Sequence, residues 1–127
     1  LGKRLLTTAG DVMRTEEMPV ITPEMHLGEA IIQVSRGKLG LGIAERNGEI
    51  AGLITDGDIR RAMEKWKAQF FDKTVADIMT TRPKTVSADT KISDVQKIMS
   101  RYKIHSVLVA DKHNHLLGVV DHYSCMI

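Results

Sequence analysis

The sequence predicts an α+β fold made of two copies of one β-α-β-β-α unit. Three observations predict this fold: an internal duplication, apolar residues at helical spacing in both copies, and pairs of apolar segments separated by turn residues. The chain of 127 residues is 43% hydrophobic and 27% charged, so it can form a packed core without disulfides or a structural metal. Its one cysteine suits a reducing compartment, and we expect a cytoplasmic protein.

The duplication is visible as short motifs that recur about 65 residues apart. Ala9–Met13 reappears as Val75–Met79, and Gly52–Ile54 aligns with Gly118–Val120. Solenoid repeats run roughly 20 to 50 residues per unit, so the longer spacing favours two copies of one supersecondary unit.

Each element of the first copy has a local signal. Apolar residues at helical spacing predict the two longer helices, and the second stripe includes Ile59 and Trp66. Asn47-Gly48 predicts a tight hairpin between two strands, because both residues tolerate positive φ. The expected elements are a helical turn at 9–13, an extended segment at 19–22, a helix at 27–36, strands at 41–45 and 49–55, and a helix at 56–65.

The second copy predicts the same order with two differences. Its hairpin turn is longer, at 112–115, and its last helix begins at His122 but is truncated or very short, because the chain stops at Ile127. The expected elements are a helical turn at 75–79, an extended segment at 84–87, a helix at 92–102 and strands at 106–110 and 116–121.

Charge and composition argue against several function classes. The net charge is +2, aromatic residues make up 4%, and basic residues are interspersed with acidic ones, which is not typical of a nucleic-acid-binding face. The apolar runs are too short to span a bilayer, and no secretory signal opens the chain. The first residue is Leu1 rather than Met, so we expect a piece of a longer protein.

The strand-to-helix turn Thr55–Asp58 is the most informative segment. Free N–H groups and the positive dipole at a helix N-terminus suit a phosphate, which the Thr55 hydroxyl would also bind. Asp58 would then accept hydrogen bonds from two adjacent ribose hydroxyls. In the alternative interpretation, Thr55 or Asp56 caps the helix and Asp58 only stabilises its first turn. A calcium loop is a poor alternative, because the further ligands are missing.

Other candidate residues are weaker. Gly40 and Gly42 either let a base approach the backbone or mark a kinked strand. Trp66 is interpreted as helix packing rather than as a platform for base stacking. His113-Asn114-His115 is interpreted as a solvated turn rather than a metal site, because it has no further ligands. Acids and bases are not paired in any predicted pocket, so we expect no catalytic site.

The two copies, each with a Gly-apolar-apolar stretch that leads into the last helix, resemble a tandem CBS domain pair over nearly the whole chain. Thr55–Asp58 followed by Ile59–Arg61 is more specific and resembles the CBS pair at the C-terminus of D-arabinose 5-phosphate isomerases, the SIS-CBS family. Leu1–Leu6 is similar to the segment that joins their sugar isomerase (SIS) domain to the pair. The resemblance implies two repeats packed with pseudo-twofold symmetry. The expected parts are a joining segment at 1–8, a first CBS motif at 9–66, a linker at 67–73 and a second CBS motif at 74–127.

The resemblance implies one competent nucleotide site, in the first copy. Gly52, Thr55 and Asp58 fit the family pattern, which gives phosphate and ribose roles to Thr55 and Asp58. In the second copy Asp121 replaces the Thr, and a carboxylate there repels phosphate; Ser124 replaces the Asp and cannot hold a ribose diol with two oxygens. The expected ligand-binding residues are Ile21, Thr22, Gly40, Leu41, Gly42, Thr55, Asp56, Asp58, Arg61, His105 and Ser106.

The function that the resemblance implies is regulation of an isomerase that interconverts ribulose 5-phosphate and arabinose 5-phosphate, for Kdo and lipopolysaccharide or capsule synthesis. The effector would be a nucleotide or nucleotide-sugar, with CMP-Kdo as the candidate, and no cofactor or metal is required. Expected partners are this effector, the parent's isomerase domain and a second copy in a homodimer, without nucleic acid or membrane. The fragment itself is expected to be inactive. Two alternatives stay open: a ligand-free dimerisation or structural module, and the CBS pair of another adenine-nucleotide-sensing protein.

Overall fold

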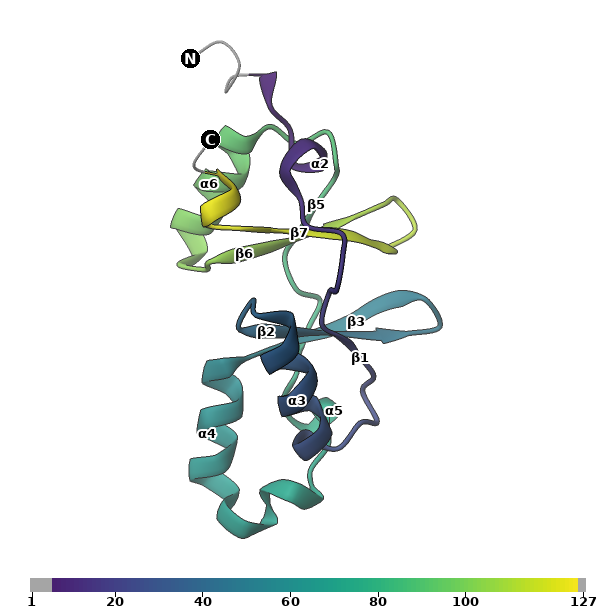
Figure 1. The fold of residues 1–127 in the computed structure, drawn as a ribbon, viewed down its shortest axis with the longest axis vertical. Coiled ribbons are helices and arrows are strands. Elements are labelled where there is room, and N and C mark those ends of the chain that lie inside the picture. Colours follow the sequence, from purple (N-terminus) through teal and green to yellow (C-terminus); the bar gives the residue numbers. More distant parts are fainter. Residues whose placement is uncertain (1–5, 126–127) are drawn as a thin grey trace. The chain divides into compact units, whose positions relative to one another are not determined.

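The structure, a computed structural model, describes residues 6–125, which form two compact units (Figure 1). One unit is Pro19–Pro83, and the other combines the chain up to Met18 with the chain from Lys84 onward. Each unit is a sheet with helices packed on it, which confirms the predicted α+β class. Most of the joining segment predicted at 1–8 lies outside the described residues, as do the last two positions of the chain.

The Pro19–Pro83 unit has a four-stranded sheet in the order β1-β2-β3-β4. β1 is parallel to β2, whereas the β2–β3 and β3–β4 pairs are antiparallel. Figure 1 shows α3 and α4 on the same face of this sheet. The bounds are β1 Val20–Ile21, α3 Leu27–Gly37, β2 Leu41–Arg46, β3 Glu49–Thr55, α4 Asp56–Trp66, η1 Lys67–Asp72, α5 Val75–Ile78 and β4 Thr80–Thr81.

The hairpin and helices of this unit form where the sequence predicts them. Asn47 and Gly48 both have positive φ, 55° and 80°, as a tight two-residue turn requires. α4 is amphipathic and buries Ile59 and Ala62 in the core. These elements place Thr55, the last residue of β3, at the N-terminus of α4.

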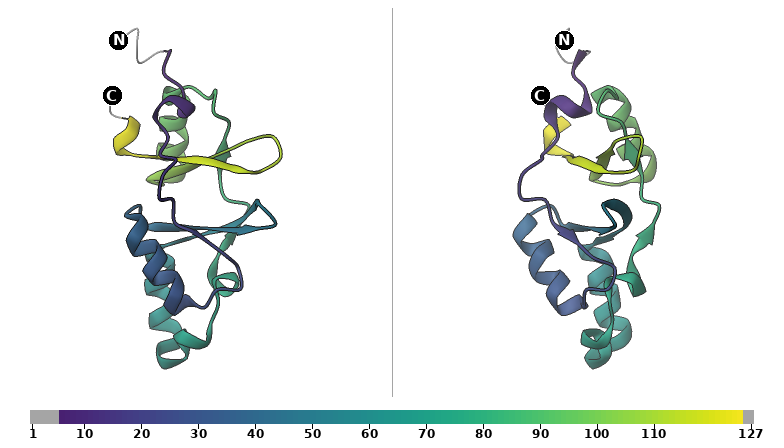
Figure 2. Two further views of the ribbon diagram at one scale, coloured as in Figure 1. Left: turned by 45° about the vertical axis from the view of Figure 1, so that its right-hand side comes forward. Right: turned by 90° about the vertical axis from the view of Figure 1, so that its right-hand side faces the viewer.

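The other unit has a three-stranded sheet in the order β5-β6-β7, with β5 parallel to β6 and β6 antiparallel to β7. Figure 2 shows α6 packed on one face of this sheet. The predicted short last helix is found as the 3-10 turn η2. The bounds are α2 Ala9–Val12, β5 Thr85–Val86, α6 Ile92–Tyr102, β6 Ser106–Ala110, β7 Leu116–Asp121 and η2 Tyr123–Cys125.

The short helix that opens each repeat packs in the unit that holds the rest of the other repeat. The Ala9 N–H of α2 donates to the Thr90 carbonyl at 2.7 Å, within the unit of β5, β6 and β7. In the Pro19–Pro83 unit, the Val75 N–H of α5 donates to the Met25 carbonyl at 2.9 Å. The compact units therefore do not coincide with the stretches 9–66 and 74–127 that carry the sequence repeats.

Residues 67–73, the predicted linker, are packed rather than solvated. They contain η1, and the Phe70 side chain is 1% exposed within the core of the Pro19–Pro83 unit. Burial of one Phe side chain stabilises a fold by about 1.5–3 kcal/mol, so Phe70 anchors this segment to the core. This stretch connects the repeats and also completes the core of the first.

Candidate functional site

The turn between β3 and α4 forms a reciprocal capping box. The Thr55 hydroxyl accepts a hydrogen bond from the Asp58 backbone N–H at 3.1 Å. In return, Asp58 Oδ2 accepts one from the Thr55 backbone N–H at 2.9 Å. Such a box pairs two N–H groups that a helix N-terminus otherwise leaves free. The structure thus shows the capping role of both residues, and capping fixes both side chains at the helix N-terminus.

The second carboxylate oxygen of Asp58 pairs with Arg61. Arg61 Nη2 lies 2.6 Å from Asp58 Oδ1, and the side chains are 69% and 21% exposed respectively. An exposed pair of this kind contributes only about 0.3–0.5 kcal/mol. Little free energy is therefore lost when Arg61 leaves Asp58.

A hollow of about 200 Å³ lies beside this pair, between α4 and α5. Trp66 presents its ring here, and Lys65 Nζ and Lys73 Nζ lie 5.0 Å and 4.9 Å from the ring centre. An aromatic ring with ammonium groups beside it offers an apolar surface and positive charge together, which suits an anionic ligand with a ring. The lining residues are Asp58, Arg61, Ala62, Lys65, Trp66, Asp77 and Ile78.

The sequence predicts only part of this hollow. Asp58 and Arg61 are among the predicted ligand-binding residues, and Trp66 packs against the core as expected. The sequence did not predict that Trp66, Lys65 and Asp77 line the hollow. Helical spacing from Asp58 was the available signal, because residues three and four apart on a helix share a face. Asp77 gave no such signal, since α5 reaches the hollow only through the tertiary fold.

Gly40 and Asp56 lie together but line a different hollow. Its volume is about 430 Å³, and it lies between α3 and α4. The Asp56 N–H donates to the Gly40 carbonyl at 3.0 Å, and Gly40 has a φ of 69°. A Cβ on Gly40 would lie 3.2 Å from Asp56 Oδ2. The two residues thus support the local turn beside the N-terminus of α4.

Three of the predicted wall residues belong to the core. The Ile21 and Leu41 side chains are 1% and 4% exposed. A Cβ on Gly42 would lie 2.9 Å from Ile21 Cδ1 and 3.0 Å from Val34 Cγ2. Close packing therefore accounts for glycine at this position. Thr22, which follows Ile21, is exposed.

His105 and Ser106 belong to the unit of β5, β6 and β7. The His105 carbonyl accepts a hydrogen bond from the His122 N–H at 2.8 Å, and the two imidazole rings are 6.4 Å apart. His105 is exposed, and Ser106 begins β6. That these residues join the Thr55–Asp58 site stays a prediction.

The turn of the second copy differs in its charge. Asp121 Oδ1 accepts hydrogen bonds from both the backbone N–H and the hydroxyl of Ser124, each at 2.8 Å. A carboxylate is therefore bound where the first copy has a neutral hydroxyl. That phosphate is repelled here stays a prediction.

The hairpin turn between β6 and β7 is exposed and is organised by Asp111. Asp111 Oδ1 accepts hydrogen bonds from the backbone N–H groups of His113 and His115. The His115 N–H is the largest cause of a lowered pKa of Asp111. Across residues 6–125, no group of three or more His, Cys, Asp or Glu is arranged to hold a metal ion. In that same range, no helix is both long and apolar enough to cross a membrane.

Comparison with known families gives two matches along the chain. The model of the CBS domain matches residues 9–65 and again residues 75–126. The chain belongs to the CBS domain family. It is a CBS pair, and the two matches correspond to the two sequence repeats.

The curated relatives of this CBS pair are longer proteins. The probable arabinose 5-phosphate isomerase of Haemophilus influenzae is 37% identical over 121 residues, which cover 95% of this chain and 36% of the relative. The arabinose 5-phosphate isomerase KdsD of Francisella tularensis is 30% identical, with coverage of 94% and 37%. The chain thus spans little more than a third of the length of these relatives.

Solved CBS pairs share the fold. The CBS pair of protein MJ0100 in complex with 5′-methylthioadenosine and S-adenosyl-L-methionine superposes with a TM-score of 0.84 at 24% identity, covering 95% of this chain and 94% of that chain. CBSX2 in complex with AMP superposes with a TM-score of 0.80 at 22% identity, covering 94% and 93%.

Proposed function

We propose that this CBS pair is a regulatory module that binds a nucleotide or nucleotide-sugar at the Thr55–Asp58 turn. The observation that carries the proposal is the joint placement of Asp58 and Arg61 at the N-terminus of α4, beside a hollow lined by a Trp ring and a lysine. Similar CBS pairs have been solved with AMP and with S-adenosyl-L-methionine. In this proposal the Asp121 turn of the second repeat binds no phosphate, because its N-cap group is a carboxylate.

Each residue of the turn has a distinct part in the proposed binding. The Thr55 hydroxyl and the positive end of the α4 dipole bind a phosphate, because a helix N-terminus favours an anion. Asp58 accepts hydrogen bonds from two adjacent ribose hydroxyls. Arg61 leaves Asp58 as the ligand enters and pairs with a phosphate oxygen through its planar fork of donors.

The proposed parent is a cytoplasmic arabinose 5-phosphate isomerase, as the named relatives suggest. The candidate effector is CMP-Kdo, an anionic nucleotide-sugar, and the parent's isomerase domain and a second CBS pair are the proposed partners. In this proposal the module does no chemistry itself. The effector changes activity by preferring one arrangement of the CBS pair against the isomerase domain.

Isothermal titration of the chain with CMP-Kdo, CMP, AMP and ATP tests the proposal. We expect saturable binding of at least one of these, and its loss in Asp58→Ala. The matched control is Asp11→Ala, because Asp11 Oδ2 accepts a hydrogen bond from the Thr8 backbone N–H at α2, in the other unit, as Asp58 Oδ2 does from Thr55. Both variants lose the carboxylate that accepts from the N-cap N–H, and only Asp58→Ala also removes the Arg61 pair and the proposed ligand contact. Equal nucleotide affinity in the wild type and in a folded Asp58→Ala variant would contradict the assignment of this site.

A ligand-free structural module is the second candidate function. The observation that favours it is the full use of Asp58: both carboxylate oxygens are bound within the chain, by Thr55 and Arg61. Under this alternative none of the four compounds binds. Sedimentation of the wild-type chain then gives a stable dimer, and the unligated Asp58 contributes only to the stability of α4.

A further inference from the structure

We infer that the unit of β5, β6 and β7 carries a second anion site, on the C-terminal half of α6, which binds the phosphate group of a phosphorylated metabolite. The site is a hollow of about 260 Å³ between α6 and the start of β5. It is separate from the Thr55–Asp58 turn, which belongs to the Pro19–Pro83 unit. The lining residues are Lys84, Thr85, Lys97, Ile98, Arg101 and Tyr102.

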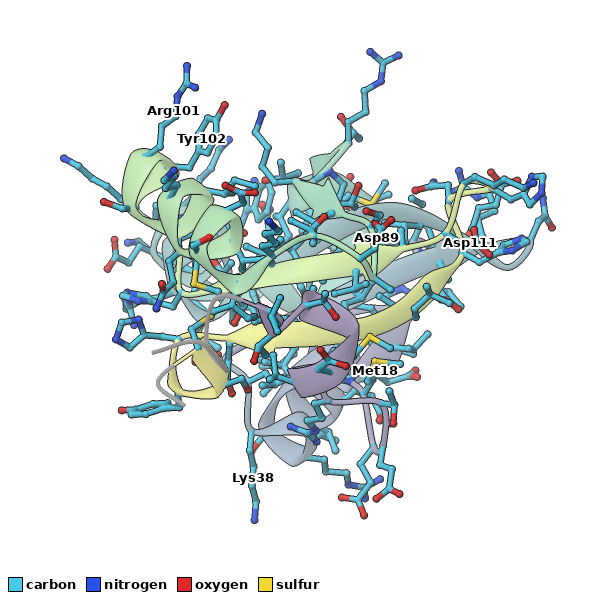
Figure 3. All side chains as sticks on the ribbon, turned by 90° about the horizontal axis from the view of Figure 1, so that it is seen from above. Met18, Lys38, Asp89, Arg101, Tyr102 and Asp111 are labelled. Carbon is cyan, nitrogen blue, oxygen red and sulfur yellow. The ribbon has the colours of Figure 1, made fainter. Side chains whose placement is uncertain are left out.

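The hollow concentrates positive charge around an aromatic ring. Lys84 Nζ lies 4.3 Å from the centre of the Tyr102 ring, and Arg101 Cζ lies 5.5 Å from it. Figure 3 shows Arg101 and Tyr102 side by side, both extending outward from α6. The ring therefore holds two cations in place, and cation–π contacts at such exposed sites contribute about 0.5–1 kcal/mol each to the fold.

These cations are not neutralised by carboxylates. Among residues 6–125, neither Lys84 nor Arg101 forms an ion pair. Lys97 has one distant partner, with Nζ 3.9 Å from Asp94 Oδ1, and both side chains are well exposed. Lys97 and Arg101 are also four residues apart on one helix, where like charges repel. The local surplus of charge is therefore available to an anion.

The fold does not require this surplus, as the equivalent place in the first repeat shows. The positions of Lys84, Lys97 and Tyr102 are taken there by Pro19, Ile32 and Gly37. Pro19 and Gly37 close the corner by packing, since a Cβ on Gly37 would lie only 2.6 Å from Pro19 Cβ, whereas the Ile32 side chain is exposed. The same supersecondary unit thus folds with no lysine at either position.

Phosphate is the anion that best fits this set of donors. A guanidinium presents paired donors that match phosphate oxygens, and two ammonium groups add charge without demanding a fixed geometry. Thr85 adds a hydroxyl at the rim. The Tyr102 side chain is 43% exposed, so its ring also offers a surface to the sugar that carries the phosphate.

The test is a titration of the ¹⁵N-labelled chain with inorganic phosphate, ribose 5-phosphate and ribose, followed by NMR at constant ionic strength. We expect saturable shifts at 84–85 and 97–102 with both phosphates and none with ribose. Tighter binding of ribose 5-phosphate identifies a sugar phosphate as the ligand, whereas equal binding identifies free phosphate. A wild-type chain without saturable shifts at these residues would overturn the inference.

A matched pair of variants separates a site from general charge. Arg101→Gln is expected to weaken binding about fivefold or more, the loss of one charge-assisted contact in an exposed place. Arg36→Gln is the control, because Arg36 holds the equivalent place in the last turn of α3 and changes net charge equally. An equal loss in both variants would refute a local site. Asp58→Ala is expected to leave these shifts unchanged, which keeps this inference distinct from the nucleotide site.

Discussion

The turns that follow β3 and β7 share one backbone plan but differ in the chemical group at the N-cap position. At the first, a neutral hydroxyl of Thr55 caps α4, and Asp58 returns a hydrogen bond to Thr55. At the second, the capping atom is a carboxylate oxygen of Asp121, and Ser124 supplies both donors. Capping is satisfied in both. The difference lies in the electrostatic potential that a ligand phosphate would meet, so stability and binding are separable at this turn.

The glycine at the same place in each repeat shows what the fold itself demands. A Cβ on Gly52 would lie 2.6 Å from Met79 Sδ, and one on Gly118 would lie 2.7 Å from Met13 Sδ. In both units the strand packs against the short helix that opens the other repeat. The packing contact is thus kept in both copies, while the charge at the turn is not.

The largest loss of stability is expected when a side chain is added at either of these two glycines. Gly52→Val and Gly118→Val each place side-chain atoms against a backbone carbonyl that cannot move aside, 2.9 Å and 2.8 Å from the Cβ position. We expect each to lower the free energy of unfolding by about 3 kcal/mol. Urea unfolding measures the change, with Glu49→Ala at an exposed position of β3 as the control. A loss in only one unit would show that the two contacts are not equivalent.

The next largest effect is expected from converting the first turn to the charge of the second. Aspartate is about as good an N-cap as threonine, so Thr55→Asp should change the free energy of unfolding by less than about 0.5 kcal/mol. A further negative charge beside Asp56 and Asp58, at the N-cap next to the bound phosphate, should weaken nucleotide binding by about tenfold or more. Isothermal titration measures the change in affinity, and urea unfolding measures the change in stability separately. Unchanged affinity in this variant would mean that phosphate does not sit at the helix N-terminus.

A smaller effect is expected from removing each hydroxyl. Thr55→Ala removes the acceptor of the Asp58 N–H and should lower the free energy of unfolding by about 1 kcal/mol. Ser124→Ala should cost less than about 0.5 kcal/mol, because Asp121 still accepts from the backbone N–H of residue 124. Thermal melts of both variants, followed by circular dichroism, provide the comparison. Equal losses would contradict the assignment of Asp121 as the cap.

Local signals were enough for the elements of the fold but not for their pairing. The Asn47-Gly48 turn and the apolar stripe of α4 are written into short stretches of sequence, and both form as predicted. The exchange of α2 and α5 between the two units cannot be predicted from such short stretches. The two copies have similar sequences, so either pairing satisfies the local pattern. The burial of Phe70 follows from the same tertiary arrangement and has no signal within its own segment.

The same limit applies to the candidate site. Thr55, Asp58 and Arg61 could be predicted, because they lie at the N-cap and in the first two turns of one helix and their spacing is visible in the sequence. The ring of Trp66 and the carboxylate of Asp77 could not be placed, since α4 and α5 form the hollow only when they pack together. The sequence therefore predicts the site residues that lie on one element, but not those that a second element contributes.

The smallest effect is expected from acid, through carboxylates that hydrogen-bond N–H groups outside the two strand-to-helix turns. The backbone N–H of Thr8 is the largest cause of the lowered pKa of Asp11, and that of His115 is the largest cause for Asp111. A pKa lowered in the folded state means that the folded protein holds the charged form more strongly than the unfolded chain does. The resulting stabilisation is present above the ordinary value of 3.8 and is lost as the pH falls through the lower, folded pKa.

Melting temperatures measured from neutral pH down to below that range should therefore fall, and Asp111→Asn should make the fall shallower. An unchanged slope in Asp111→Asn, relative to Glu49→Gln as a control, would show that the turn of the second hairpin does not contribute to acid sensitivity.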